Sequence, residues 1–329
     1  MAEPKVVITD LVADELTPER EVLEGVACLE ALDARQEEEL LGRIEDADAV
    51  IVYRLDLSRR TIERLEHCRI IVRGGVGHDR IDGLFARERG IPVANVPDYC
   101  TEEVADSALG LMLALTRGLS SMNSQLQASA VPWSYVEAGP LRRLRGRALG
   151  IVGLGRIGTA TALRAKSLGM EVAYYDPYRP LGFDKALGLR RMATLEELVR
   201  SSWILSLHCP LTPETRGMID ARMLSLLPHG AYLVNTARGA LLDTAAIPAA
   251  VASGRLAGVG LDVLEHEPPA EDDPLVHSWR NPQHPAYSRV VLTPHSAFYS
   301  EESRRELRTK AALTCRRALA GEPILSVVN

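Results

Sequence analysis

The chain has 329 residues, which is more than one average domain needs and enough for two domains that each bury a core of their own. Its content of 46% hydrophobic and 25% charged residues is that of an ordinary globular protein. The formal net charge of −6 offers no general electrostatic attraction to nucleic acid or to an anionic membrane surface, so we expect neither as a partner.

The first third of the chain alternates short apolar runs with amphipathic segments. Its start has no signal-peptide pattern and leads directly into a run of β-branched residues. Buried strands are predicted at 5–9, 49–53, 69–72 and 91–95, and helices at 33–44 and 58–66. This alternation predicts a parallel sheet with helices on both faces.

A long helix is predicted after these strands, at 102–119. Thr101 suits its N-cap, Glu102 and Glu103 suit its first turn, and apolar residues recur at helical spacing. We expect this helix to bridge two lobes.

A second set of apolar runs fills the rest of the chain. Strands are predicted at 148–153, 171–176, 203–208, 231–236, 258–263 and 289–293, and a last helix at 301–321. The fold class predicted is therefore α/β, with two nucleotide-fold-like halves and domain boundaries near 100 and 294.

The cysteines indicate a reducing environment. Five are present, scattered and without a CxxC pair, so neither a disulfide framework nor a metal site is expected. No run of about 18 apolar residues suggests a membrane span. We expect a cytoplasmic protein with reduced thiols.

A glycine-rich pattern points to a dinucleotide. Gly153, Gly155 and Gly158 match G-x-G-x-x-G, with Arg156 and Ile157 between the last two, after a predicted strand and before a small-residue helix. The glycines would allow a tight turn, close approach to a pyrophosphate and close packing of the helix, whose N-terminus favours the phosphates. The alternative is that the glycines serve only a strand-to-helix turn.

An acidic residue completes the pattern. Asp176 ends the next predicted strand, 18 residues after Gly158, where it would accept hydrogen bonds from the adenosine ribose. This favours NAD(H) over NADP(H), a preference that Arg179 would soften.

Eight segments carry a family resemblance in their order along the chain. They are RGGVGHDRID (73–82), NVPDYCTEEVADSALGLML (95–113), IVGLGRIG (151–158), YYDPY (174–178), LHCPLTPETRGMI (207–219), LVNTARGALLD (233–243), LDVLEHEPP (261–269) and TPHSAFYSEE (293–302). They resemble the motifs of the D-isomer-specific 2-hydroxyacid dehydrogenases, and within these the branch that contains the C-terminal binding proteins.

The resemblance implies two Rossmann-like or flavodoxin-like domains with parallel sheets, the cofactor domain being inserted into the substrate domain. It places a substrate domain at 1–99 and 294–329, an NAD-binding domain at 100–293, and the active site in the cleft between the two lobes. It also implies a homodimer formed through the helix 102–119 and the arm 120–147.

The resemblance assigns the catalytic Arg, Glu and His to Arg238, Glu267 and His295. Reduction of a 2-oxo acid needs a cation that holds the carboxylate and polarises the ketone, which a forked guanidinium provides. It also needs a proton for the developing alkoxide, and His295 suits this because histidine titrates near neutral pH. Glu267 would orient the imidazole and fix its tautomer.

The resemblance also implies substrate and cofactor contacts. For the substrate these are Gly75, Val76 and Gly77 at the carboxylate, Arg73 as a second cation or as support for the loop, and Tyr53 and Phe298 as pocket walls or ordinary packing residues. Phe298 stands where the C-terminal binding proteins have Trp. For the cofactor they are His208, Cys209, Pro210, Thr215, Thr236, Ala237, Asp262 and Ala297.

Segment 270–289 is longer than the common family connection. Its Trp279 would cover the cleft or meet a partner subunit, and a plain surface loop is the alternative.

Three functions remain open from the sequence. The first is an NAD-dependent 2-hydroxyacid dehydrogenase that reduces a small 2-oxo acid. The second is a binding module that senses NADH and recruits partners. The third is a reductase of a specialised anion such as a phosphonate, a keto-sugar acid or a biosynthetic intermediate.

Overall fold

The computed structural model describes residues 3–10, 12, 14–135 and 141–329. They form two compact units, one made of Met1–Cys100 with Tyr299–Asn329 and the other of Thr101–Phe298, so the second is inserted into the sequence of the first. Residues 294–298, placed in the first domain from the sequence, lie in the second unit. The carboxylate of Asp262 accepts hydrogen bonds from the backbone of Ser296 and Ala297 and holds them there.

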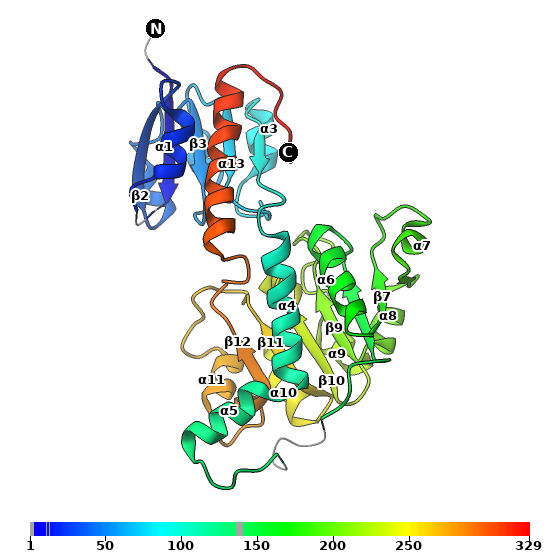
Figure 1. The fold of residues 1–329 in the computed structure, drawn as a ribbon. Coiled ribbons are helices and arrows are strands. Elements are labelled where there is room, and N and C mark those ends of the chain that lie inside the picture. Colours follow the sequence, from blue (N-terminus) through cyan, green and yellow to red (C-terminus); the bar gives the residue numbers. More distant parts are fainter. Residues whose placement is uncertain (1–2, 11, 13, 136–140) are drawn as a thin grey trace. The chain divides into compact units, whose positions relative to one another are not determined.

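The first unit has a five-stranded parallel sheet in the order β2-β1-β3-β4-β5, which is the flavodoxin-like order (Figure 1). Its elements are β1 (Lys5–Asp10), α1 (Thr17–Leu23), β2 (Cys28–Ala34), η1 (Glu37–Leu40), β3 (Ala49–Val52), α2 (Arg59–Ile62), β4 (Ile70–Arg73), α3 (Gly83–Glu88), β5 (Val93–Asn95) and α13 (Glu301–Leu319).

Both faces of this sheet are covered, which explains why β3 is apolar throughout and β4 is apolar up to its last residue, Arg73. Helices α1 and α13 pack together on one face (Figure 1). On the other face, Val50 and Val52 pack with Leu40, Ile62 and Ala86 from η1, α2 and α3.

The second unit has a seven-stranded parallel sheet in the order β12-β11-β10-β9-β6-β7-β8, a Rossmann order with one further strand. Its elements are α4 (Thr101–Thr116), α5 (Leu119–Ala128), β6 (Ala148–Val152), α6 (Arg156–Ser167), β7 (Glu171–Tyr175), α7 (Phe183–Leu187), β8 (Arg190–Arg191), α8 (Leu195–Ser201), β9 (Ile204–Leu207), α9 (Ala221–Leu226), β10 (Ala231–Asn235), η3 (Gly239–Leu241), η4 (Thr244–Ala246), α10 (Ile247–Ala252), β11 (Leu256–Leu261), α11 (Pro274–Arg280), α12 (Ala286–Arg289) and β12 (Val290–Leu292).

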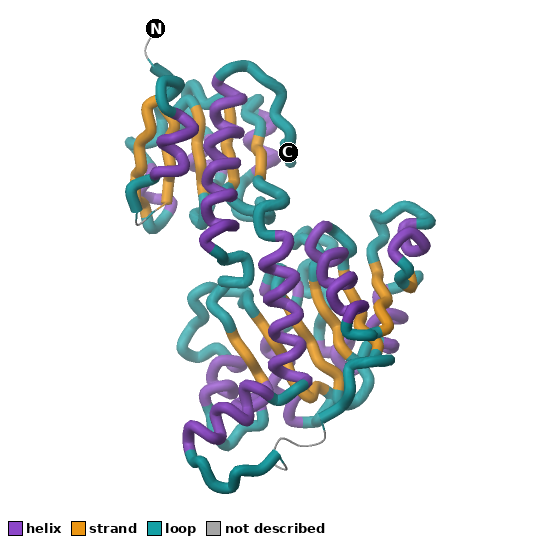
Figure 2. Tube along the Cα trace, viewed as in Figure 1, coloured by secondary structure: helices purple, strands orange, loops and turns teal. Residues whose placement is uncertain are grey.

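Successive residues of β6 face opposite sides of this sheet. Ile151 packs with Met112 of α4 and Ala162 of α6, whereas Val152 belongs to the core formed by the helices after β8, including Leu224. Figure 2 shows helices around the strands of this unit. The strands therefore expose little more than their ends, and the loops at those ends carry the polar residues.

All ten predicted strands are present, but several helix predictions were wrong. The helix predicted at 33–44 is replaced by the end of β2 and the short η1, because residues 28–34 pair with β1. The helix predicted at 58–66 is reduced to α2. The helix predicted at 102–119 ends at Thr116, and α5 begins after Gly118, whose φ is +63°.

Segment 270–289 contains α11 and α12 and is not a plain surface loop. Leu275 and Ala286 are fully buried, and Trp279 packs against the core of the second unit. Among the described residues, no helix is both long and apolar enough to cross a membrane.

Candidate functional site

The candidate residues of the second unit lie in the segments that follow strands of its sheet, and five of them come directly after a strand. Gly153 follows β6, Asp176 follows β7 and His208 follows β9, while Thr236 and Asp262 follow β10 and β11. Because these strands are parallel, their carboxyl ends lie along one edge of the sheet, and the strand order reverses beside β6. In α/β sheets this is the edge at which ligands bind, and it is the candidate functional site.

Two glycines of the fingerprint have clear steric reasons. Gly153 has a φ of +87°, and a Cβ there would lie 2.7 Å from the backbone nitrogen of Cys209. A Cβ on Gly158 would lie 2.1 Å from the carbonyl oxygen of Gly153, so glycine is needed where α6 packs on the loop. Helix α6 begins at Arg156 and Ile157, and its first N–H groups, which have no partner within the helix, adjoin this loop.

Two observations fit a bound dinucleotide. Gly155 is the N-cap of α6, and a Cβ on it would have one neighbour within 4 Å, the tip of Arg179 at 3.8 Å, so its backbone is open to a ligand. The hydroxyl of Thr236 is buried and has no hydrogen-bond partner in the described part of the chain. A ligand group that reaches this hydroxyl would satisfy it.

Asp176 is held firmly at the end of β7. Its Oδ2 accepts a hydrogen bond from the backbone nitrogen of Leu154 (2.8 Å), and its Oδ1 accepts one from that of Tyr178 (2.9 Å). The guanidinium of Arg179 lies 3.6 Å from Oδ2. The carboxylate is thus fixed beside the glycine-rich loop, with a cation next to it.

The residues after β9 form a neutral stretch of this edge. Nε2 of His208 lies 2.9 Å from Oγ of Ser206, and burial lowers the pKa of His208 to about 4. Burial raises the pKa of the Cys209 thiol to about 12. The hydroxyl of Thr215 donates to the carbonyl oxygen of Pro210 (2.7 Å) and closes the turn that follows. At neutral pH both His208 and Cys209 are therefore uncharged.

The loop after β10 is shaped by Asn235, which the sequence analysis missed. Its side-chain oxygen accepts from the backbone nitrogen of Ala237 (3.0 Å), and its side-chain nitrogen donates to the carbonyl oxygen of Arg238 (2.8 Å). The Arg238 guanidinium donates to the carbonyl oxygen of Ala237 (2.8 Å). A polar residue at the end of an otherwise apolar buried strand was the signal for this role.

The loops after β10 and β11 touch because residue 239 is glycine. A Cβ on Gly239 would lie 1.9 Å from the backbone carbonyl carbon of Leu264. The backbone nitrogen of Leu264 in turn donates to Oε1 of Glu267 (3.0 Å). The loop that carries Arg238 is therefore packed against the loop that leads to Glu267.

Glu267 and His295 are in direct contact. Nδ1 of His295 lies 2.6 Å from Oε2 of Glu267, and both side chains are partly exposed. His295 has a φ of +52°, which is uncommon for a residue with a side chain. The ring of Phe298 lies edge-on to the imidazole, with 6.5 Å between the ring centroids.

Asp262 holds the segment that carries His295. Its buried carboxylate accepts hydrogen bonds from the hydroxyl of Thr293 (2.6 Å) and from the backbone of Ser296 and Ala297 (both 2.9 Å). Its own carbonyl oxygen accepts from the backbone nitrogen of His295 (2.8 Å). A carboxylate has about four acceptor positions, so Asp262 retains capacity for one more donor beyond these three.

The remaining candidates lie in the first unit, in the loops after β3 and β4. Gly75 has a φ of +154°, and the Arg73 guanidinium donates to the carbonyl oxygen of Gly74. The side-chain amide of Asn95 donates to the carbonyl oxygen of Val76 (2.7 Å), just before Gly77. Arg73 thus supports the loop. Tyr53 follows β3 and donates its hydroxyl to Glu19 (2.8 Å).

The edge of the second sheet can therefore carry out a specific kind of chemistry. The Glu267–His295 pair can move a proton, the adjoining loop carries a guanidinium, and the glycine-rich loop can hold a pyrophosphate. The described residues contain no group of three or more His, Cys, Asp or Glu side chains that could hold a metal ion.

Comparisons with known proteins agree with this geometry. Residues 109–297 match the family model described as "D-isomer specific 2-hydroxyacid dehydrogenase, NAD binding domain". The solved structure of D-lactate dehydrogenase from Aquifex aeolicus, complexed with NAD and lactic acid, superposes with a TM-score of 0.86 at 27% identity and covers 96% of each chain.

Two curated relatives extend the similarity over nearly the whole chain. D-3-phosphoglycerate dehydrogenase of Methanocaldococcus jannaschii is 35% identical over 326 residues, which is 99% of this chain and 59% of the relative. C-terminal-binding protein 1 of Caenorhabditis elegans is 34% identical over 316 residues, which is 92% of this chain and 42% of the relative. The chain therefore spans only part of the length of these relatives.

Proposed function

The chain belongs to the D-isomer specific 2-hydroxyacid dehydrogenase family with an NAD-binding domain, and we propose that it is an NAD(H)-dependent dehydrogenase of a small 2-hydroxy acid. The observation that carries the proposal is the contact between Glu267 and His295 at the same sheet edge as a complete dinucleotide fingerprint. The direction proposed is reduction of the 2-oxo acid.

The proposed cofactor contacts follow the strand ends. The N–H groups of residues 155–158 would bind the pyrophosphate, and Asp176 would bind the adenosine ribose. Thr236, Ala237, Asp262 and Ala297 would surround the nicotinamide, whose bound, reduced form supplies the hydride. His208, Cys209, Pro210 and Thr215 would flank the cofactor with neutral surface.

The proposed roles of the chain's own residues balance the reaction. Arg238 would hold the carboxylate and polarise the carbonyl of the 2-oxo acid. As hydride adds to C2, the C=O π electrons move to oxygen, and Nε2 of His295 gives that oxygen a proton. Nδ1 of His295 donates to Glu267 throughout, which keeps Nε2 available for this transfer.

The proposed substrate domain is residues 1–99 and 294–329, which are the first unit without Cys100 together with residues 294–298 of the second unit. The loop Gly75–Gly77, which Arg73 supports, would bind the substrate carboxylate together with Arg238, and Phe298, which lies beside His295, would contact the substrate side chain. An aromatic ring beside the imidazole supports an apolar substituent at C3.

A homodimer is proposed from the surface of the second unit. Helix α5 has no buried residue, and large apolar side chains on it and after it are strongly exposed. They are Leu119 (55%), Leu126 (37%), Val131 (79%), Trp133 (81%) and Tyr135 (80%). Part of the arm predicted at 120–147, residues 136–140, lies outside the described residues. A second copy of this chain is the proposed cover for these side chains.

Cytoplasmic location is also proposed, because the five cysteines are free thiols.

Sedimentation of the wild type and of Trp133→Glu tests the dimer. We expect a dimer that the substitution weakens, and a wild-type monomer would contradict it.

The catalytic assignment is tested with His295→Ala. Loss of the proton donor should lower kcat by about 100-fold or more, while the Kd for NADH stays within about twofold of the wild type. His277→Ala, an exposed histidine on α11, is the matched control. Unchanged turnover in His295→Ala would refute the assignment.

A further inference from the structure

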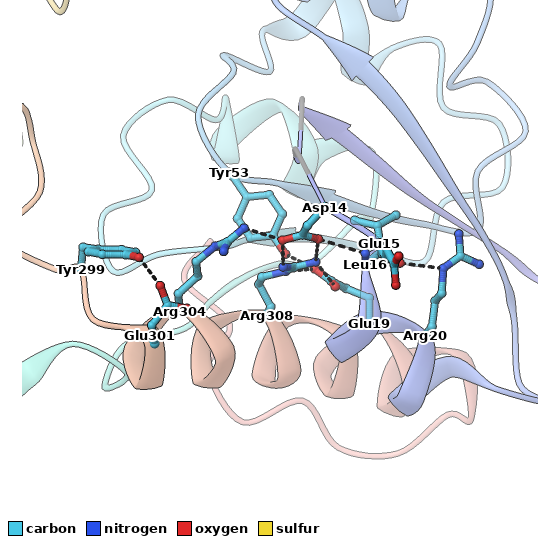
Figure 3. A network of polar contacts seen from close by, with 10 residues as sticks. All are labelled: Asp14, Glu15, Leu16, Glu19, Arg20, Tyr53, Tyr299, Glu301, Arg304 and Arg308. Carbon is cyan, nitrogen blue, oxygen red and sulfur yellow. Dashed lines mark hydrogen bonds and ion pairs between the residues drawn. The ribbon is translucent and has the colours of Figure 1, made fainter.

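A buried ion pair joins two helices of the first unit. Arg308 on α13 is 5% exposed, and Glu19 on α1 is fully buried. Nε of Arg308 donates to Oε1 of Glu19 (2.7 Å) and Nη2 donates to Oε2 (2.6 Å), so the pair is bidentate (Figure 3). This geometry fixes the orientation of the Glu19 carboxylate more closely than a single contact would.

Asp14 fills the other side of the same guanidinium. Its carboxylate accepts from Nη1 (2.6 Å) and Nη2 (2.9 Å) of Arg308, and also from Arg304 (Figure 3). The hydrogen bonds from Arg308 lower the pKa of Asp14. Two cations thus meet two carboxylates, and the network is balanced in charge.

Tyr53 connects this network to the strand ends. Its backbone nitrogen donates to the buried carboxylate of Asp10 (3.1 Å), and its hydroxyl donates to Oε1 of Glu19 (2.8 Å). Burial raises the pKa of Tyr53 well above 10, so the hydroxyl remains a donor at neutral pH. Tyr53 is therefore held both at its backbone nitrogen and at its side-chain hydroxyl.

The ring of Tyr53 lies against the loop that follows β4. A Cβ on Gly74 would lie 2.4 Å from two carbons of this ring, so only glycine fits there. The backbone nitrogen of Gly74 donates to the carbonyl oxygen of Val52 (2.8 Å), the residue before Tyr53. The position of the Tyr53 ring thus limits where the backbone of Gly74, at the start of the loop 74–77, can lie.

We propose that Arg308, Glu19 and Tyr53 form a positioning chain that sets the conformation of the loop 74–77. Tyr53 is then a positioning residue, whose ring is held against Gly74 by the hydrogen bond to Glu19. The consequence for substrate affinity rests on the proposed function, in which this loop binds the substrate carboxylate.

Stability alone does not explain such a network. Burying a charged pair costs desolvation that its attraction only partly offsets, and apolar residues of similar volume stabilise a protein as well or better. The pair instead fixes an orientation. Its bidentate contact holds Oε1 of Glu19 at a defined position, where this oxygen accepts the hydrogen bond from the Tyr53 hydroxyl.

The test is Tyr53→Phe in the full chain, which keeps the ring and removes its hydrogen bond to Glu19. Amide hydrogen exchange of residues 74–77 is measured without ligand and should accelerate about 10-fold, while strand β1 is unchanged. Arg305→Ala is the matched control, because Arg305 pairs with Glu21 (3.3 Å) between the same two helices but on the surface. It should leave the loop unchanged.

A double variant checks the connection. Arg308→Lys removes the bidentate contact with Glu19 and should also accelerate amide exchange of residues 74–77. In the double variant with Tyr53→Phe the two effects on the exchange rate should not add. Unchanged exchange in Tyr53→Phe, or equal acceleration throughout the first unit, would overturn the proposal.

Kinetics test the consequence separately. With pyruvate as the probe acid, Tyr53→Phe should raise the KM for pyruvate several-fold. The rise in KM should accompany the faster amide exchange of residues 74–77, while kcat and the affinity for NADH stay nearly constant. A wild type without activity on any acid would count against the proposed function, and the exchange data would still decide the positioning chain.

Discussion

Nδ1 of His295 lies 2.6 Å from Oε2 of Glu267, whose other oxygen accepts a hydrogen bond from the backbone of Leu264. The Glu267 carboxylate is therefore held by the backbone through one oxygen while the other oxygen contacts the imidazole. The backbone nitrogen of His295 donates to the carbonyl oxygens of Asp262 and Thr293, and the residue adopts a φ of +52°. A left-handed backbone at a residue with a side chain costs about 1 kcal/mol or more, so the surrounding structure must impose it.

Removing the charge of Glu267 should impair proton transfer. Glu267→Gln keeps the size of the side chain but weakens its hold on Nδ1, and we expect kcat to fall by about 100-fold, with NADH binding retained. Glu265→Gln, at an exposed glutamate two residues earlier, is the control for the same chemical change. Equal kcat in the two variants would show that Glu267 does not act on His295.

Asp176 should determine the choice between NADH and NADPH. Asp176→Asn keeps an acceptor for Leu154 but removes the charge that repels a 2′-phosphate. The ratio of kcat/KM for NADH to that for NADPH should fall about 10-fold. Arg179→Ala should change the ratio in the opposite direction, because it removes the cation beside Asp176. Identical ratios in all three proteins would refute this role.

The sequence predicted the strands well because buried parallel strands are apolar along their whole length. The edge strand β2 was missed, since its outer face is polar and Glu30 and Asp33 interrupt the apolar pattern. Gly118 divides the long helix, but an isolated glycine in a helical pattern is a weak signal.

The predicted site residues lie after strands, and their positions can be predicted because the strands are clear in the sequence. The contacts between side chains could not be predicted in this way. Glu19 and Arg308 are 289 residues apart in sequence, and no local pattern indicates that they pair. Asn235 was likewise missed because its role is to bond backbone atoms of a loop whose course depends on the fold.

Glycine at position 158 should contribute to the stability of the fold as well as to NADH binding. A Cβ there meets the carbonyl oxygen of Gly153, so Gly158→Ala should destabilise the protein by about 1–3 kcal/mol and weaken NADH binding. Gly110→Ala, in α4, meets no atom within 4 Å among the described residues and should stabilise by about 0.5–1 kcal/mol. Thermal unfolding midpoints that shift in the same direction would contradict the packing argument.

Buried His208 should make stability depend on pH. Burial lowers its pKa from 6.5 to about 4, so between these values the unfolded chain binds a proton that the folded chain does not. Its contribution to stability is complete above pH 6.5 and is lost as the pH falls towards 4, by up to about 3 kcal/mol.

His208→Gln tests this dependence. Unfolding free energies measured from neutral to acidic pH should fall less steeply in this variant than in the wild type. His277→Gln, which removes an exposed histidine, should follow the wild-type curve. A wild-type slope in His208→Gln would mean that His208 does not titrate differently on unfolding.

The central claim is tested most directly by mixing the purified protein with NADH and a panel of 2-oxo acids graded by side-chain size, and following the loss of NADH absorbance. We expect rapid oxidation of NADH with at least one acid and slower oxidation of NADPH with the same acid. Tight binding of NADH without turnover of any acid would contradict it, and would leave an NADH-sensing module or a reductase of a specialised anion as the function to pursue.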